Sequence, residues 1–293
     1  MLRRSRRLAE VRRRFADDLR RSGPLDSDAL VEAFAKVERE RFLPPGPWLL
    51  LDTPEGYSSS PDADPARVYC DAAIAIDPSR LLNNSQPSLV ARLLQTLAVA
   101  PGDRVVHLGC ATGYTTAILA QLVGRGGVVT GVEIDPRIFA HARKALRRVR
   151  PVELFEADAL EVDPGPANVI VVDGGVTHAA PQWLDRLLPG GRLSLPLTAV
   201  RPPTRISRHL RNYRGRLLLV TREGAGFRAR FTEPLGIAAL YGAKDPERQK
   251  SLEEAFGRGG HETVRSLRRE PHDPGPECWF HSEGFCLSTL VPG

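Results

Sequence analysis

Several features that mark other classes of protein are missing from this 293-residue chain. No apolar run is long enough to span a bilayer. The N-terminal stretch MLRRSRRLAEVRRRF has neither the apolar segment nor the small-residue cleavage site of a secretory signal. Asp17 and Asp18, followed by a helical pattern, also argue against a transit peptide. We therefore expect a cytoplasmic protein with no membrane partner.

Cysteine is scarce, with only Cys70, Cys110, Cys278 and Cys286 in the chain. Four scattered cysteines do not make a disulfide framework, and no two have the C-x-x-C spacing of a zinc site. Cys278 and Cys286 could meet across a hairpin, but in a reducing cytosol buried or half-buried thiols are the expected state. We expect no disulfide and no metal.

The net charge of +6 is concentrated at the N-terminus, where the first 21 residues hold nine arginines against three acidic residues. Leu8, Val11, Phe15 and Leu19 recur at helical spacing, which predicts an amphipathic helix with a basic outer face. Such a face can attract nucleic acid, an anionic membrane or an acidic peptide; the alternative, which we favour, is a solvated helix surface. No aromatic residues interleave with the arginines, and the N-P-P-Y or D-P-P-Y signature of base methylation is absent. Nucleic acid is therefore not expected as a partner.

Composition and periodicity divide the chain into a helical and loop region (1–68), a core (69–243) and a C-terminal appendage (244–293). Within the core, short apolar strands alternate with helices, which predicts an α/β fold with a Rossmann-like, doubly wound, mostly parallel sheet. Two strands around the turn at 223–226 predict an antiparallel hairpin at the edge of this sheet. The expected helices are 5–21, 28–41, 87–97, 115–123, 136–149, 183–188 and 245–256; the expected strands are 104–108, 127–132, 152–155, 169–172, 191–197, 217–221 and 227–231; and 44–67 is expected as loop.

The turn from Gly109 to Gly113, between a predicted strand and a predicted helix, is the most informative motif. Its two glycines permit a tight turn and a close approach of the backbone to a ligand. Glu133 follows Gly113 by twenty residues, at the end of the next strand, where a carboxylate can accept hydrogen bonds from a ribose diol. Asp158, after the third strand, is placed to accept a hydrogen bond from an adenine amino group.

This constellation favours S-adenosylmethionine over a dinucleotide. Thr116 stands where G-x-G-x-x-G has its third glycine, and S-adenosylmethionine has no pyrophosphate to hold. A glycine turn in a cofactor-free α/β protein is the alternative, but it does not account for the two acidic residues. The residues expected to bind the cofactor are His107, Gly109, Cys110, Ala111, Thr112, Gly113, Glu133, Ile134, Asp158, Ala159 and Asp173.

Several motifs, in one order along the chain, resemble the protein-L-isoaspartate O-methyltransferases. Val37–Pro44 is similar to their V-x-R-x-x-F-x-P, Tyr69–Ile76 to their Y-x-D-x-x-L-P-I, and Ser85–Leu94 to their S-x-P-x-x-V-A-x-M-L. The resemblance covers roughly residues 30–240. It implies an S-adenosylmethionine-dependent methyltransferase that acts on a carboxylate of an aspartyl or isoaspartyl residue in a protein or peptide.

The chain departs from this family mainly in the part that would meet the substrate. The family's loop I-G-x-G-Q-T-I-S is replaced by Ile76–Ser85, which is two residues longer and has no glycine. His107 replaces the usual acidic residue at the end of the first strand, and Asp173-Gly174-Gly175 stands where the family has T-A-A. The last 50 residues have no counterpart in the compact repair enzymes. The resemblance thus implies a retained cofactor half and a remodelled substrate half.

The resemblance also implies which residues meet the substrate. Ser85, with Asn83 and Asn84, is expected to donate hydrogen bonds to the substrate carboxylate; turn formation and helix N-capping are the alternative roles of the two asparagines. Residues Ile76, Gly174 and His178 are expected to bind the substrate.

Three functions stay open on the sequence. The first is repair, in which the methyl ester of an isoaspartyl site cyclises to succinimide. The second is tailoring of a dedicated, ribosomally made peptide, in which an aspartyl ester forms aspartimide, as in relatives with C-terminal extensions. The third is a non-catalytic cofactor-binding protein that uses the basic helix and the aromatic tail for a partner.

Overall fold

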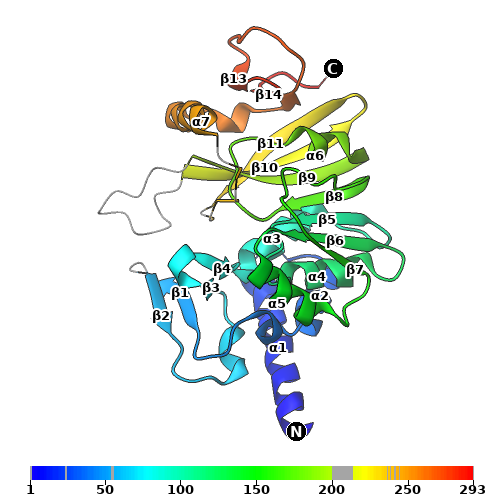
Figure 1. The fold of residues 1–293 in the computed structure, drawn as a ribbon, viewed down its shortest axis with the longest axis vertical. Helices are drawn as coiled ribbons and strands as arrows, with labels where there is room; N and C mark the ends of the chain where they lie inside the picture. The colour runs from blue at the N-terminus through cyan, green and yellow to red at the C-terminus, as the bar shows by residue number, and fades with distance from the viewer. Residues whose placement is uncertain are drawn as a thin grey trace. The chain divides into compact units, whose positions relative to one another are not determined.

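The structure is a computed structural model that describes residues 2–23, 25–53, 56–199, 214–235, 237, 239–240, 242–243 and 245–292 (Figure 1). The chain divides into two compact units. The first unit is Met1–Asp103 with Cys110–Glu156, and the second is Arg104–Gly109 with Ala157–Gly293. The three segments expected from composition (1–68, 69–243 and 244–293) stay a prediction. Within the described part of the chain, no helix combines the length and the apolar character that crossing a membrane requires.

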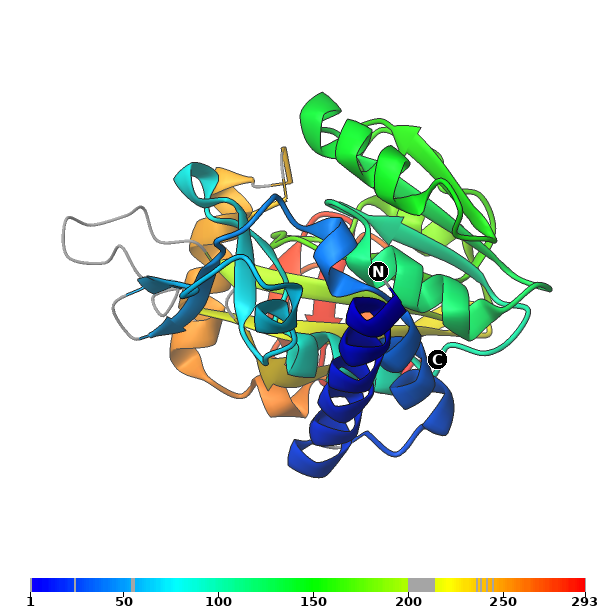
Figure 2. The ribbon, with the colours of Figure 1, turned by 90° about the horizontal axis from the view of Figure 1, so that it is seen from below.

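The first unit begins with two helices, α1 (Leu2–Ser22) and α2 (Asp28–Lys36), which pack against each other (Figure 2). Ser27 caps α2, since its side chain accepts a hydrogen bond from the Leu30 backbone N–H at 3.3 Å. Phe15 and Leu19 of α1 are buried. The predicted apolar face of α1 is therefore confirmed over its C-terminal half.

Arginines of the basic face of α1 form ion pairs within the first unit. Arg7 pairs with Asp64, Arg13 with Glu32, and Arg20 with Asp28. Exposed ion pairs contribute little to stability, but these pairs neutralise part of the positive charge that the sequence concentrates here.

The region predicted as loop over 44–67 contains regular structure, so that prediction is wrong. The strands β1 (Leu49–Thr53) and β2 (Gly56–Ser59) form an antiparallel hairpin, and the 3₁₀ helix η2 (Pro65–Val68) follows. Proline, glycine and serine hid these elements, because the strands depend on pairing with distant residues: Leu50 lies opposite Ser58 on one side and Ile74 on the other.

Two further strands complete a small sheet in the order β2-β1-β3-β4. They are β3 (Ala73–Asp77) and β4 (Leu82–Asn84), joined by the 3₁₀ helix η3 (Pro78–Arg80). The helix predicted over 28–41 ends at Lys36, because Val37 is extended (ψ 121°), and continues only as the 3₁₀ helix η1 (Arg39–Phe42).

The remaining elements of the first unit follow the prediction closely. They are α3 (Pro87–Leu97), α4 (Tyr114–Val123), α5 (Pro136–Leu146) and the parallel strands β6 (Val128–Glu133) and β7 (Val152–Glu156). Almost every residue of α4 is buried, which fits its apolar sequence on all sides. Asp135 caps α5 by accepting from the backbone N–H groups of Arg137 and Ile138, with Pro136 at the first helical position.

The second unit carries one continuous run of strands in the order β13-β14-β12-β11-β10-β9-β8-β5 (Figure 1). The parallel part is β5 (Arg104–Leu108), β8 (Ala167–Val172) and β9 (Leu187–Ala199). The predicted hairpin is confirmed as β10 (Arg214–Glu223) and β11 (Gly226–Pro234). A short helix, α6 (Pro181–Asp185), precedes β9.

The C-terminal segment adds further strands to this hairpin, so the sheet is mixed and β11 is not its outer strand. After α7 (Pro246–Arg258) and η5 (His261–Thr263), β12 (Ser266–Arg268) pairs with β11, and β14 (Phe285–Ser288) pairs with both β12 and β13 (Cys278–Ser282). The sequence showed an appendage there but not that it extends the sheet, because strand order depends on pairing between distant segments.

Candidate active site

The glycine turn has the geometry that its sequence suggested. The backbone N–H of Cys110 donates to Val132 O at 2.9 Å, and that of Gly113 donates to Cys110 O at 2.9 Å. Gly113 has a φ of 93°, and a Cβ there would lie 2.5 Å from Leu146 Cδ1. Only glycine therefore fits the last position of the turn.

Glu133 lies beside this turn and is held by backbone donors. Its Oε2 accepts from Ala111 N at 2.9 Å and its Oε1 from Asp135 N at 3.0 Å. The side chain is buried, and this burial raises the pKa of the carboxyl group, while the two backbone hydrogen bonds oppose the rise. The Ile134 backbone also forms a hydrogen bond with this carboxylate. The two oxygens together have four lone pairs, so acceptor capacity remains for a ligand.

The second unit holds other residues that the sequence assigned to the cofactor. His107 is fully buried at the end of β5, with Nε2 3.5 Å from Asp173 Oδ2. Asp158 accepts from the Leu160 N–H through Oδ1 at 2.8 Å. Ala159 lies next to it and is tied by its carbonyl to Trp183 Nε1 at 2.9 Å. These hydrogen bonds hold the segment after β7 in place. The bond to Leu160 uses Oδ1 of Asp158 and does not involve Oδ2.

The residues present fit S-adenosylmethionine. The Thr112 hydroxyl, in the middle of the glycine turn, is buried and has no hydrogen-bond partner among the residues that the structure describes. Because buried polar groups are normally paired, this orphan atom indicates that a ligand completes the turn. Cys110, Ala111, Thr112 and Gly113 lie with Glu133 and Ile134 in the first unit, and His107, Gly109, Asp158, Ala159 and Asp173 in the second. The cofactor assignment of each of these residues stays a prediction.

The predicted substrate residues Asn83, Asn84 and Ser85 lie at and just after β4. Asn83 Oδ1 accepts from the Tyr57 hydroxyl at 2.5 Å, and its Nδ2 donates to Leu81 O at 3.0 Å. Asn84 is buried, and its Oδ1 accepts from Arg39 Nε at 3.2 Å. The N-cap position of α3 is Gln86, whose side chain makes no capping hydrogen bond, so neither asparagine caps this helix. Both amide side chains thus have structural partners, whereas Ser85 is half-buried and is engaged through its carbonyl.

Arg39 organises this region, a role that the sequence analysis did not assign. Its guanidinium is fully buried and, besides Asn84, donates to four backbone carbonyls at 2.7–3.2 Å. Burial is the main influence on its pKa and lowers it. The signal was present as the arginine of the V-x-R-x-x-F-x-P resemblance. The carbonyl acceptors belong to Val68, Cys70, Ala72 and Ser85.

A second contact that the sequence did not reveal joins the altered loop to the N-cap residue of α5, just after the strand that carries Glu133. Arg80, on η3, forms an ion pair with Asp135 Oδ2. The pair lowers the pKa of Asp135 through the hydrogen bond from Arg80. The longer loop is thereby attached two residues beyond Glu133.

The remaining predicted substrate residues are Ile76, Gly174 and His178. Ile76 is half-buried on β3. A Cβ on Gly174 would lie 2.8 Å from Leu240 Cβ, so the close packing of Leu240 by itself requires glycine there. The ring of His178 is half-buried, with Nδ1 3.1 Å from the Thr177 hydroxyl, and burial is the main cause that lowers its pKa to about 4.

Comparison with known proteins identifies the family. The family model described as protein-L-isoaspartate(D-aspartate) O-methyltransferase (PCMT) matches residues 10–217. A protein-L-isoaspartate O-methyltransferase of Aeropyrum pernix is 32% identical over 193 residues, which cover 64% of this chain and 67% of that protein. One from Methanopyrus kandleri is 29% identical over 192 residues, which cover 64% and 76%.

Solved structures support the fold. A protein-L-isoaspartate O-methyltransferase superimposes with a TM-score of 0.63 at 23% identity, covering 88% of this chain and 72% of its own. The protein from Plasmodium falciparum, described as a complex with S-adenosyl-L-homocysteine, superimposes with a TM-score of 0.60 at 17% identity, covering 78% and 97%. The predicted α/β, Rossmann-like fold is confirmed, and its sheet is mixed. The chain belongs to the protein-L-isoaspartate O-methyltransferase family and is an S-adenosylmethionine-dependent carboxyl O-methyltransferase.

Proposed function

We propose that this enzyme methylates the carboxylate of an isoaspartyl residue in a peptide or protein, and that the turn at 109–113 with Glu133 holds the methyl donor. The observation that carries the proposal is the position of Glu133: it lies buried at the end of β6, fixed by the backbone N–H groups of Ala111 and Asp135, with acceptor capacity left for a diol. The family model spans this motif and the Ser85 loop together.

The chemistry asks the protein for positioning rather than for proton transfer. Bound S-adenosylmethionine supplies an electrophilic methyl group on a sulfonium. A carboxylate is already deprotonated at neutral pH, so no general base is required. The protein has to hold the acceptor oxygen in line and keep water away, and such alignment supplies a large part of an enzyme's rate acceleration. Ser85 is our candidate donor to the acceptor carboxylate.

His178 fits a role at the acceptor as a neutral group. Its lowered pKa keeps the imidazole uncharged at pH 7, so it can donate or accept a hydrogen bond without competing as a cation for the carboxylate. Asn83 and Asn84 act in this proposal by positioning the loop, because their side chains bond Tyr57 and Arg39.

A dedicated peptide acceptor is the second candidate, and one observation favours it. The altered loop is tied by Arg80 to Asp135, and Asn83, in the position of the family's loop threonine, is bonded to Tyr57. These contacts fix the altered loop in a conformation that depends on residues of this chain. Such a loop favours an acceptor that differs from a general isoaspartyl site. A cytoplasmic location, with a peptide or protein as partner and without nucleic acid or membrane, belongs to either version of the proposal.

The test is transfer of a labelled methyl group to an isoaspartyl peptide and to its aspartyl twin. Base-labile label on the isoaspartyl peptide alone is the expected result. Ser85→Ala should lower kcat/KM for the peptide about 10-fold or more, the loss of one hydrogen bond to a charged group. Ser88→Ala, on the nearby first turn of α3, is the matched control and should retain the activity of the unmodified enzyme.

Two other results would redirect the assignment. Label on neither peptide, with S-adenosylhomocysteine binding intact, would reject isoaspartyl repair and favour a dedicated acceptor. Equal activity of Ser85→Ala and Ser88→Ala would remove Ser85 from the site.

A further inference from the structure

The C-terminal segment brings two histidines and two cysteines together, outside the region matched by the family model. One ligand atom from each of His272, Cys278, His281 and Cys286 lies within 4.8 Å of the others. All four cysteines of the chain are free thiols, as expected from the sequence, so Cys278 and Cys286 are available as ligands. The family model ends at residue 217.

The backbone places three of these side chains on one face of the hairpin β13–β14. His281 and Cys286 are direct cross-strand partners. Cys278 lies opposite Ser288 and Phe280 opposite Leu287, so Trp279 is the extra residue of a β-bulge. Residues three apart in a regular strand point to opposite faces; the bulge restores Cys278 and His281 to the same face.

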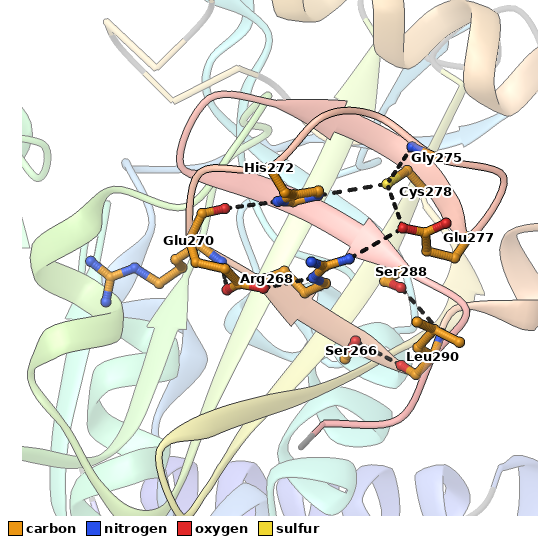
Figure 3. Close-up of polar contacts among 10 residues, drawn as sticks. Ser266, Arg268, Glu270, His272, Gly275, Glu277, Cys278, Ser288 and Leu290 are labelled. Carbon is orange, nitrogen blue, oxygen red and sulfur yellow. Dashed lines mark hydrogen bonds and ion pairs between the residues drawn. The ribbon is translucent and has the colours of Figure 1, made fainter.

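His272 comes from the loop between β12 and β13, and Figure 3 shows it beside Cys278. Its Nδ1 lies 2.7 Å from Glu270 O, and its Nε2 lies 3.7 Å from Cys278 Sγ. A hydrogen bond from Nδ1–H to a carbonyl fixes the tautomer in which Nε2 carries the free lone pair, an arrangement typical of metal-bound histidine.

His281 has a buried ring nitrogen that is available to bind a metal ion. Its Nδ1 is buried and has no hydrogen-bond partner in the part of the chain that the structure describes. The rings of His272 and His281 are nearly perpendicular, at 85°, with centroids 4.7 Å apart. Their nitrogen lone pairs can therefore approach one point from different directions, which a tetrahedral ion requires.

We propose that His272, Cys278, His281 and Cys286 bind a structural zinc ion. Zinc–sulfur bonds of about 2.3 Å and zinc–nitrogen bonds of about 2.0 Å place tetrahedral ligand atoms about 3.3 to 3.8 Å apart. The distance of 3.7 Å between Cys278 Sγ and His272 Nε2 lies within this range. Two thiolate and two imidazole ligands are a preferred set for Zn²⁺, and four protein ligands close the coordination sphere.

The surroundings suit two bound thiolates. The Gly275 N–H donates to Cys278 Sγ at 3.5 Å. Arg268 lies directly opposite Cys286 on β12 and pairs with Glu270 and Glu277, both next to the cluster (Figure 3). These contacts place an N–H donor beside Cys278 and a guanidinium-bearing residue opposite Cys286.

The function assigned to the ion is to stabilise the C-terminal segment. Residues 269–277 contain no helix or strand, and β12, β13 and β14 are only three to five residues long. The hairpin buries Phe280, Phe285 and Leu287, but no residue of the loop 269–277 is buried. A metal ion can stabilise a segment that has no apolar core of its own. The proposed ion links the irregular loop to both strands of the hairpin and takes no part in methyl transfer.

This proposal departs from the expectation of no metal. That expectation rested on the absence of C-x-x-C spacing, whereas the ligands follow the pattern H-x5-C-x2-H-x4-C. The signal that could have revealed them is the C-x2-H pair Cys278 and His281 with a second cysteine across a glycine turn.

The test uses the unmodified protein purified under reducing conditions with zinc supplied, then passed over a desalting column. Elemental analysis should find one zinc per chain. A thiol reagent should modify Cys278 and Cys286, read by peptide mass spectrometry, faster once a chelator has removed the metal. Cobalt(II) in place of zinc should give the visible spectrum of a tetrahedral thiolate site.

Variants assign the metal to these side chains. Cys278→Ser and His281→Gln should each lower the zinc content severalfold, while Cys70→Ser, a half-buried thiol in the first unit, should retain one zinc per chain. Folded unmodified protein with no zinc after such loading, or a Cys278–Cys286 disulfide under reducing conditions, would overturn the proposal. Zinc content that is equal in all three variants would place any bound metal elsewhere and overturn it too.

Discussion

At the scale of single residues, the neighbours of a buried polar group determine whether it can still form a hydrogen bond with a ligand. Glu133 is buried but keeps acceptor capacity, and the Thr112 hydroxyl is buried without a partner among the described residues. Asn84, which the sequence assigned to the substrate, is buried as a partner of Arg39. Buried polar residues therefore have different roles, according to whether other side chains already occupy their hydrogen-bonding groups.

Glu133→Gln should weaken binding of S-adenosylhomocysteine about 10- to 100-fold. The carboxylate accepts from the N–H groups of Ala111 and Asp135, and an amide NH₂ would face one of these donors with another donor. A hydrogen bond to a charged group contributes about 1.5–3 kcal/mol, which corresponds to this range. Isothermal titration calorimetry measures the dissociation constant.

Glu156→Gln is the control for this substitution. Glu156 ends β7 as Glu133 ends β6, but it is exposed. Its substitution should leave the dissociation constant unchanged. An affinity of Glu133→Gln equal to that of the control would mean that Glu133 does not hold the ribose.

At the scale of elements, one buried arginine fastens the segments that surround the substrate loop. From η1, Arg39 reaches the carbonyls around η2, the start of α3 and the side chain at the end of β4. The guanidinium carbon of Arg39 also lies 5.7 Å from the centroid of the Tyr114 ring, a cation–π contact that links Arg39 to the first turn of α4. The planar guanidinium presents a rigid fork of donors and can therefore hold several irregular segments at once, beside the apolar cluster that includes Val68, Ala72 and Ile74.

Arg39→Met should lower the free energy of unfolding by about 3–5 kcal/mol. The substitution keeps the aliphatic stem but leaves buried acceptors, among them Val68 O and Ala72 O, without donors, and each such group costs about 1–3 kcal/mol. Urea denaturation followed by fluorescence measures the change.

Arg41→Met provides the comparison two residues along. Arg41 is exposed, donates to a single carbonyl, that of Ala145, and forms an exposed ion pair with Glu38. Its loss should cost about 1 kcal/mol at most. Equal effects of the two substitutions would show that the buried network does not stabilise the unit.

At the scale of the whole chain, the two units divide the chemistry. The first contains residues 110–113 of the glycine turn, Glu133 and the loop with Ser85. The second contains His107, Gly109, Asp158, His178 and the histidine–cysteine cluster. The family match to 10–217 includes parts of both units. The C-terminal strands belong to the second unit, where they continue the sheet from β11.

The pH dependence of stability should carry a contribution from His178. The pKa of the ring is about 4 in the folded protein, mainly through burial, with Arg248 lowering it further and Asp245 opposing. The unfolded chain has the ordinary value near 6.5. The unfolded state therefore binds the proton first, and this contribution is full above about pH 6.5 and is lost as the pH falls towards 4.

His178→Gln removes this titration. The variant should lose less stability than the unmodified protein between pH 7 and pH 5, measured as urea midpoints at each pH. Between pH 7 and 8 the two proteins should follow parallel curves. Parallel curves over the whole range from 8 to 5 would contradict the lowered pKa.

The succession of strands and helices from α3 to β11, and the geometry of the glycine turn, could be predicted from the sequence because both are local properties. Apolar runs, Pro136 after Asp135, and the glycines of the turn at 109–113 determine structure through neighbours a few residues away. The fold class and the family were accessible for the same reason, since several local motifs occur in one order.

The tertiary structure alone decided the features that depend on residues distant in sequence. The β1–β2 hairpin was hidden because its strands need Ile74 and its neighbours as partners. The network of Arg39 joins carbonyls 29 to 46 residues away, and no pattern in the sequence specifies which backbone oxygens a guanidinium meets. The histidine–cysteine cluster depends on a bulge at Trp279 and on strand pairing, which place three of its side chains on one face of the hairpin, and on the loop before β13, which brings His272 to them.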